Sequence, residues 1–156
     1  MLKLTKKADY GLIALKHVAV KNGAASAKEI ADTYRIPLPL LAKVLQTLGK
    51  KGFLKAEQGS NGGYRLARPA DSIHALEVIQ AIDGPIILTA CFTDHANCDQ
   101  SSHCNVKEPL RKIHEGIRSL LHSITIAEMA REENDAGSPL TQIEPKLFSD
   151  SVVPNA

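Results

Sequence analysis

Hydrophobic residues recur at helical intervals near the start of the chain. Residues 8–21 place apolar side chains three and four positions apart, and the pattern ends at Asn22, beside a glycine, a common end of a helix. Ser26, followed three positions later by Glu29, predicts the N-terminus of a second helix over about residues 27–34.

A third helical pattern covers about residues 39–51, with Pro39 in the first turn, where proline is tolerated. The apolar positions that we expect to be buried are Leu40, Leu41, Val44, Leu45 and Leu48. The opposite face is polar and basic and contains Lys43, Gln46, Thr47 and Lys50. Two short helices joined by a tight turn, the second polar on its outer face, are typical of a helix-turn-helix.

A β-hairpin is expected directly afterwards. Residues 53–56 and 64–67 read as two strands, and the turn between them, residues 58–63, contains three glycines. A helix-turn-helix followed by a hairpin predicts a winged helix, a mostly α fold with a small β-hairpin wing. Glycines allow the wing backbone to approach phosphates, and Arg65 is placed to reach a phosphate or the minor groove.

The second half of the chain shows a different pattern. Residues 75–83 predict a short amphipathic helix, and residues 84–106, the cysteine segment, predict a loop. A longer helix over about residues 107–122 follows, with apolar residues at intervals of three and four: Leu110, Ile113, Ile117, Leu120, Leu121 and Ile124. A solitary helix with such a seam needs a partner, so we predict a long dimerisation helix in a homodimer; the alternative is packing onto its own domain.

These patterns divide the chain into four parts. They are a winged helix-turn-helix DNA-binding domain (1–70), a linking helix with the cysteine segment (71–106), the dimerisation helices (107–133) and a tail (134–156). Thr125 is expected to cap the last helix. The tail shows no hydrophobic period and is predicted to be disordered.

Charge is distributed unevenly along the chain. Residues 1–70 hold thirteen Lys and Arg against four Asp and Glu, whereas residues 71–156 hold six against thirteen. A basic half of this size favours a polyanion partner such as DNA. No run is long enough to cross a membrane and no signal-peptide pattern is present, so we expect a cytoplasmic protein without a membrane partner. No recognisable set of nucleophile, base and orienting group appears, which argues against an enzyme.

All three cysteines lie in one stretch of fourteen residues, CFTDHANCDQSSHC. Cys91, Cys98 and Cys104 are separated by gaps of six and five residues. Thiolate sulfur suits zinc and iron–sulfur clusters, and zinc sites usually contain closer C-x2-C pairs. The wide gaps therefore favour an iron–sulfur cluster, and a zinc site or reversible thiol oxidation is the alternative.

Four segments together resemble the Rrf2 family of winged-helix transcription regulators. They are LTKKADYGLIAL, GSNGGYRLARP, EVIQAIDGPIILTAC and the cysteine segment, and the resemblance covers about residues 1–133. Within the family, the chain looks most like regulators of SUF iron–sulfur cluster assembly, relatives of IscR and of the nitric-oxide sensor NsrR. The resemblance implies a dimeric repressor of cluster-assembly genes, whose 2Fe–2S or 4Fe–4S cluster sets its affinity for operator DNA.

The resemblance also implies a ligand set in which Cys91, Cys98 and Cys104 hold the cluster. The IscR type adds a histidine three residues after the last cysteine, but this chain has Lys107 there, and a protonated lysine has no lone pair. The NsrR type adds an aspartate from the first helical turn of the partner subunit, and Asp9 occupies the matching place. The alternatives to Asp9 are His103 and His95.

Asp9 also fits a simpler role, since an aspartate in a first turn is stabilised by the helix dipole. The remaining histidines have no ligand role in this scheme. We expect His114 and His122 on the surface or in the dimer interface of the long helix, and His17 in the packing of the first helix.

The residues expected to contact DNA fall into two groups. The groove contacts are Pro39, Leu40, Lys43, Gln46 and Thr47, and the first two stand at positions that are often polar in the family. Lys43 can donate to guanine, and Gln46 can pair with adenine. The backbone contacts are Lys50, Lys51, Lys55 and Arg65, together with Asn61, Gly62 and Tyr64 of the wing.

Overall fold

The computed structural model describes residues 3–93 and 98–134 of the 156-residue chain. Its elements are α1 (Lys6–Lys21), α2 (Ala27–Tyr34), α3 (Leu38–Lys50), β1 (Leu54–Glu57), β2 (Gly63–Leu66), η1 (Ala70–Ser72), α4 (Ala75–Asp83), η2 (Ala90–Phe92), α5 (Lys107–Ser123) and α6 (Ile126–Asn134). The predicted fold class is confirmed: the described chain is mostly helical and carries one antiparallel hairpin. The expected disorder from residue 135 onwards lies outside the described residues.

Side-chain caps set the boundaries of the first two helices. Thr5 caps α1, since its hydroxyl accepts the amide N–H of Ala8 at 3.2 Å, and the helix therefore begins earlier than its apolar pattern. Ser26 caps α2 as predicted, accepting the amide N–H of Glu29 at 3.0 Å. The Glu29 carboxylate also reaches α1, where it pairs with Lys21 at 2.7 Å and meets His17 at 3.2 Å.

The winged domain, α1 to β2, has a continuous apolar core. Leu41, Val44, Leu45 and Leu48 of α3 are all buried, as expected, whereas Leu40 is only half-buried. Ile126 of α6 belongs to the same core, because α6 packs against α1 and η1. The last helix therefore contributes to the winged domain, although it follows the long helix in sequence.

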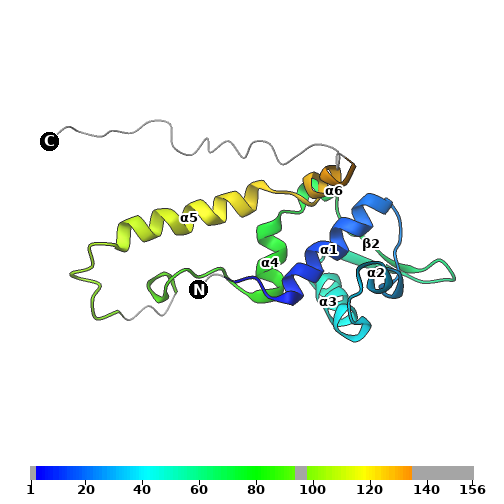
Figure 1. The fold of residues 1–156 in the computed structure, drawn as a ribbon, viewed down its shortest axis with the longest axis horizontal. Coiled ribbons are helices and arrows are strands. Elements are labelled where there is room, and N and C mark those ends of the chain that lie inside the picture. Colours follow the sequence, from blue (N-terminus) through cyan, green and yellow to red (C-terminus); the bar gives the residue numbers. More distant parts are fainter. Residues whose placement is uncertain (1–2, 94–97, 135–156) are drawn as a thin grey trace.

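Figure 1 shows α5 extending away from the winged domain, with residues 98–106 at its far end. A second cluster of buried residues, Leu76, Ile79 and Ile86, lies where α4 meets Leu12 of α1 and Leu121 of α5. The C-terminal end of α5 is thus fixed to the winged domain. No helix in the described ranges is long and apolar enough to cross a membrane.

The prediction of a surface or interface position for His114 is wrong. His114 is buried in its own chain, with its ring 5.1 Å from that of Phe92 of η2. It was misplaced because the spacing of apolar residues along α5 does not reveal that η2 covers this side of the helix. By contrast, His17 packs as expected, 3.1 Å from the hydroxyl of Tyr34.

Candidate DNA-binding surface and cysteine segment

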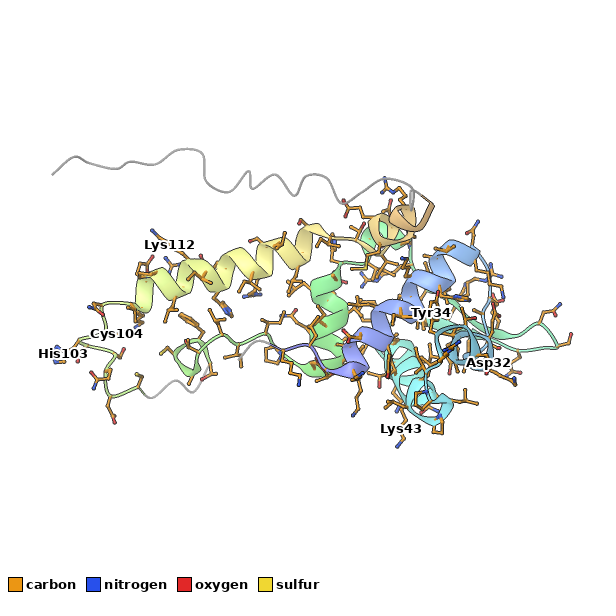
Figure 2. All side chains as sticks on the ribbon, in the orientation of Figure 1. Asp32, Tyr34, Lys43, His103, Cys104 and Lys112 are labelled. Carbon is orange, nitrogen blue, oxygen red and sulfur yellow. The ribbon has the colours of Figure 1, made fainter. Side chains whose placement is uncertain are left out.

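The outer face of α3 is exposed and basic. Lys43, Gln46 and Lys50 are all exposed, and the hydroxyl of the half-buried Thr47 donates to the carbonyl of Lys43 at 3.0 Å. Figure 2 shows Lys43 projecting outward from α3, well separated from Cys104 at the other end of the molecule. This face is free of the core contacts made by the opposite side of the helix, so it is available to enter a groove of DNA.

The wing is joined to the turn before α2 as well as to itself. The amide of Tyr64 donates to the carbonyl of Ala25 at 2.8 Å, and the amide of Ala25 donates back at 3.0 Å. A Cβ at Gly63 would overlap the carbonyl of Ala25, and a Cβ at Gly62 would lie 2.5 Å from that of Glu57. Gly62 is therefore required by the backbone packing of the hairpin itself, and Gly63 by the approach of the turn before α2.

Most of the predicted DNA-backbone contacts are exposed. Lys50, Lys51, Lys55 and Asn61 lie at the surface, while Gly62 and Tyr64 are half-buried. Arg65 is exposed but pairs with Glu57 on the neighbouring strand at 2.6 Å. A phosphate contact by Arg65 stays a prediction, and it requires the guanidinium to share or leave this pair.

The three cysteines are free thiols and all are half-buried. Cys91 lies on η2, and Cys104 lies shortly before α5 (Figure 2). Within residues 3–93 and 98–134, no three His, Cys, Asp or Glu side chains come together to hold a metal ion. The donor chemistry nevertheless fits a soft group, because three unbridged thiols on one segment are the ligands that such groups prefer.

The candidate fourth ligands are placed differently. Asp9 is exposed in the first turn of α1, and it does not join a cysteine group within its own chain. His103 is exposed and lies at the outer end of the cysteine segment in Figure 2. His95 falls outside the described residues.

One contact that the sequence did not indicate joins the end of α4, directly before the cysteine segment, to the start of α1. Asp83, the last residue of α4, accepts the backbone N–H of Thr5 at 3.1 Å and its hydroxyl at 2.5 Å. The carboxylate therefore sits at the N-terminus of α1, where the helix dipole favours negative charge. This clasp, Thr5 and Asp83, holds residue 84 close to the turn that contains Asp9. No local pattern could have revealed a pair 78 residues apart.

The α5 helix has one polar face and one apolar face. Arg111 pairs with Glu108 and, at 2.5 Å, with Glu115, and this pairing lowers the pKa of Glu108 below its ordinary value. Three apolar side chains stand about half exposed at seven-residue intervals: Val106 (51%), the N-cap of α5, and Ile113 (52%) and Leu120 (50%) on the helix itself. Such a seam is typical of a helix that pairs with another helix.

A helix-turn-helix, a hairpin wing and an exposed basic recognition face define a winged-helix DNA-binding protein. The profile of the Rrf2 family, described as an iron-dependent transcriptional regulator, matches residues 4–132, and the chain belongs to this family. It is a DNA-binding transcription regulator and not an enzyme.

Similarity to individual proteins covers most of the chain. It is 32% identical over 137 residues to the HTH-type transcriptional regulator NsrR of Shouchella clausii, covering 86% of this chain and 92% of the relative. The structure of CymR, the global cysteine regulator of Bacillus subtilis, is similar with a TM-score of 0.71 at 28% identity, covering 85% of this chain and 98% of that one. The structure of T. potens IscR has a TM-score of 0.68 at 28% identity, and the match covers 88% of this chain and 92% of that one.

Proposed function

We propose that this protein is a cytoplasmic, homodimeric repressor of SUF iron–sulfur cluster assembly genes, and that an iron–sulfur cluster sets its affinity for operator DNA. The observation that carries the proposal is the set of three free, half-buried thiols on one segment of this chain. The family to which the chain belongs is described as iron-dependent. Similarity to NsrR and IscR along most of the chain supports it.

In this proposal, Cys91, Cys98 and Cys104 hold the cluster, 2Fe–2S or 4Fe–4S, and Asp9 of the partner subunit supplies the fourth bond. When bound, the cluster would be the part of the protein that iron scarcity, oxidants or nitric oxide can remove. A carboxylate oxygen is a hard ligand for iron in such a group, so the bond to Asp9 is labile. That lability suits a sensor.

The homodimer is supported by the seam on α5. Val106, Ile113 and Leu120 are exposed in the isolated protomer, and pairing of two α5 helices would remove these side chains from water. Two paired helices also place two winged domains in one particle, as a palindromic operator requires.

Control of DNA binding follows from what the cysteine segment touches. Its first residue follows Asp83, which is clasped to Thr5 at the start of α1, and Ile86 is buried against Leu12 of the same helix. Since α1 packs on α3, a change at the cysteine segment can alter the position of the recognition helix. Two states with different affinity for DNA are what a switch needs.

The test is anaerobic purification and reconstitution, followed by the visible absorption spectrum and an assay of iron and sulfide. Wild type is compared with Asp9→Ala and with Asp71→Ala, a matched aspartate that is also exposed at the start of a helical turn. We expect a coloured wild type with iron and sulfide in near-equal amounts, a changed spectrum or loss of iron in Asp9→Ala, and no change in Asp71→Ala. A colourless wild type without sulfide would contradict the cluster.

A DNA-binding measurement completes this test. Each form is titrated onto a cluster-assembly promoter by fluorescence anisotropy, before and after removal of the cluster. Equal affinity of the two forms would contradict control by cluster state, even if the protein is coloured.

A zinc-responsive or thiol-redox repressor on the same fold is the second candidate. The similarity to CymR, a cysteine regulator, favours it. It predicts colourless protein that contains zinc, or a disulfide among the three cysteines that forms on mild oxidation and is visible by mass spectrometry. Either result in sulfide-free protein would replace the cluster proposal.

A further inference from the structure

The N-terminal tip of α3 is apolar and partly exposed to solvent. The tip consists of Leu38, Pro39 and Leu40; Leu38 is 43% exposed, Pro39 is exposed and Leu40 is half-buried. Leu38 is not one of the α3 residues that form the buried core. The packing of the winged domain therefore does not explain why an apolar side chain stands at this position.

The tip adjoins the polar stripe that faces DNA. Pro39, Lys43, Gln46 and Lys50 follow one another at intervals of four, three and four, which places them in one row along the helix. Leu38 and Leu40 flank the first member of this row. The N-terminal residues of a recognition helix are those that contact base edges in the major groove, so the apolar tip enters the groove with the row.

The side chains of the tip cannot read a base by hydrogen bonds. None of the three carries a donor or an acceptor, and no side chain caps the helix. Pro39 also lacks a backbone N–H, and the amides of Leu40 and Leu41 already donate to the carbonyl of Pro37 at 3.1 and 3.0 Å. Only apolar contact is left to these side chains.

The major groove offers one apolar group on its base edges, the 5-methyl group of thymine. We propose that Leu38, with Leu40 beside it, is a specificity-determining residue that contacts thymine methyl groups, so that the operator carries A·T pairs beneath the tip of α3. This inference rests on the DNA binding in the proposed function and deepens it by naming the bases that are read. Lys43 and Gln46 then read the adjoining bases by hydrogen bonds.

The test begins with a selection of duplexes from a random library by the purified full chain, carried out anaerobically with reconstituted and with cluster-free protein. Each thymine of the selected duplex is then replaced in turn by deoxyuridine, which lacks only the methyl group. Affinity is measured by fluorescence anisotropy. At the contacted positions we expect binding to weaken by about fourfold per methyl group, as for the burial of one such group.

The variant Leu38→Ala separates a direct contact from an effect of uracil on the shape of DNA. We expect the ratio of thymine to uracil affinity to fall from about four to about one in this variant. The matched control is Val20→Ala, since Val20 is an aliphatic residue of α1 with 44% exposure, and it keeps the wild-type ratio. Circular dichroism confirms that both variants are folded.

The outcomes are distinguishable. A selected duplex in which no thymine replacement weakens binding, or an unchanged ratio in Leu38→Ala, overturns the role of the tip and leaves DNA regulation intact. If neither form of the protein selects any duplex, the proposed function fails and this inference fails with it.

Discussion

Ile126 of α6 is expected to stabilise the winged domain, although it lies far from that domain in sequence. Its side chain is fully buried in the main core, and its amide donates to the carbonyl of Ile73 at 2.9 Å. The variant Ile126→Ala removes buried methyl and methylene groups and leaves a cavity. Substitutions of this kind cost about 2–5 kcal/mol of unfolding free energy.

The expected cost lies in the lower part of this range. The α6 helix packs against α1 and η1, so it can shift inward and partly close the cavity. We therefore expect a loss of about 2–3 kcal/mol, a large share of the roughly 5–15 kcal/mol that a domain of this kind has in total. The measurement is urea unfolding followed by far-ultraviolet circular dichroism.

The control is Ile113→Ala on α5, which removes the same atoms from a side chain that is 52% exposed in the protomer. It is expected to leave the circular dichroism spectrum unchanged and to raise the concentration at which dimers dissociate in sedimentation experiments. A loss below about 1 kcal/mol in Ile126→Ala would refute the reasoning, because it would mean that α6 is not part of the core.

Three further predictions concern the clasp, the wing and the contact between α1 and α2. Asp83→Asn should speed the loss of visible absorbance in air several-fold relative to Asp71→Asn, and equal rates would contradict a role for the clasp. Gly63→Ala should lower the unfolding free energy by about 1–3 kcal/mol, because its Cβ would overlap the carbonyl of Ala25. The urea midpoint should fall accordingly, and an unchanged midpoint would contradict this. The pKa of Glu29 is lowered from 4.5, chiefly by its hydrogen bond from Lys21, so its stabilisation is complete above pH 4.5 and is lost as the pH falls through the lowered value. Glu29→Gln should therefore flatten the acid side of the stability curve, and an unchanged curve would show that the pair contributes nothing.

Local patterns in the sequence predict much of the fold. The Ser26 cap, the apolar face of α3 and the two strands around a glycine-rich turn each depend on neighbouring residues, so the helices and the wing lie within one or two residues of their expected bounds. Contacts between distant segments were not predictable in this way. The clasp of Asp83 and Thr5, the burial of His114 beneath Phe92 and the entry of Ile126 into the core all depend on how the elements pack.

The candidate site shows the same division. The exposure of Lys43 and Gln46 follows from helical spacing, because the opposite face is apolar. The requirement for glycine at position 63 does not follow from the turn alone, since it arises from the approach of Ala25, which lies 38 residues earlier. A glycine-rich turn in the sequence was consistent with contact to phosphates, whereas the structure also assigns it to backbone packing.

The packing of α1, α3 and α4 offers the proposed switch a route from the cysteine segment to the recognition helix. A Cβ at Gly11 of α1 would overlap the end of Ile82 of α4, and it would lie 3.6 Å from Val44 of the recognition helix. Three helices therefore meet at Gly11, which lies two residues after Asp9 on α1 and contacts α4 one residue before Asp83 of the clasp. Because interiors are close-packed, a displacement of α4 at this point moves α1 or α3. In the proposed switch, a signal from the cysteine segment would need no contact with DNA, since α4, which precedes the segment, packs against both α1 and α3.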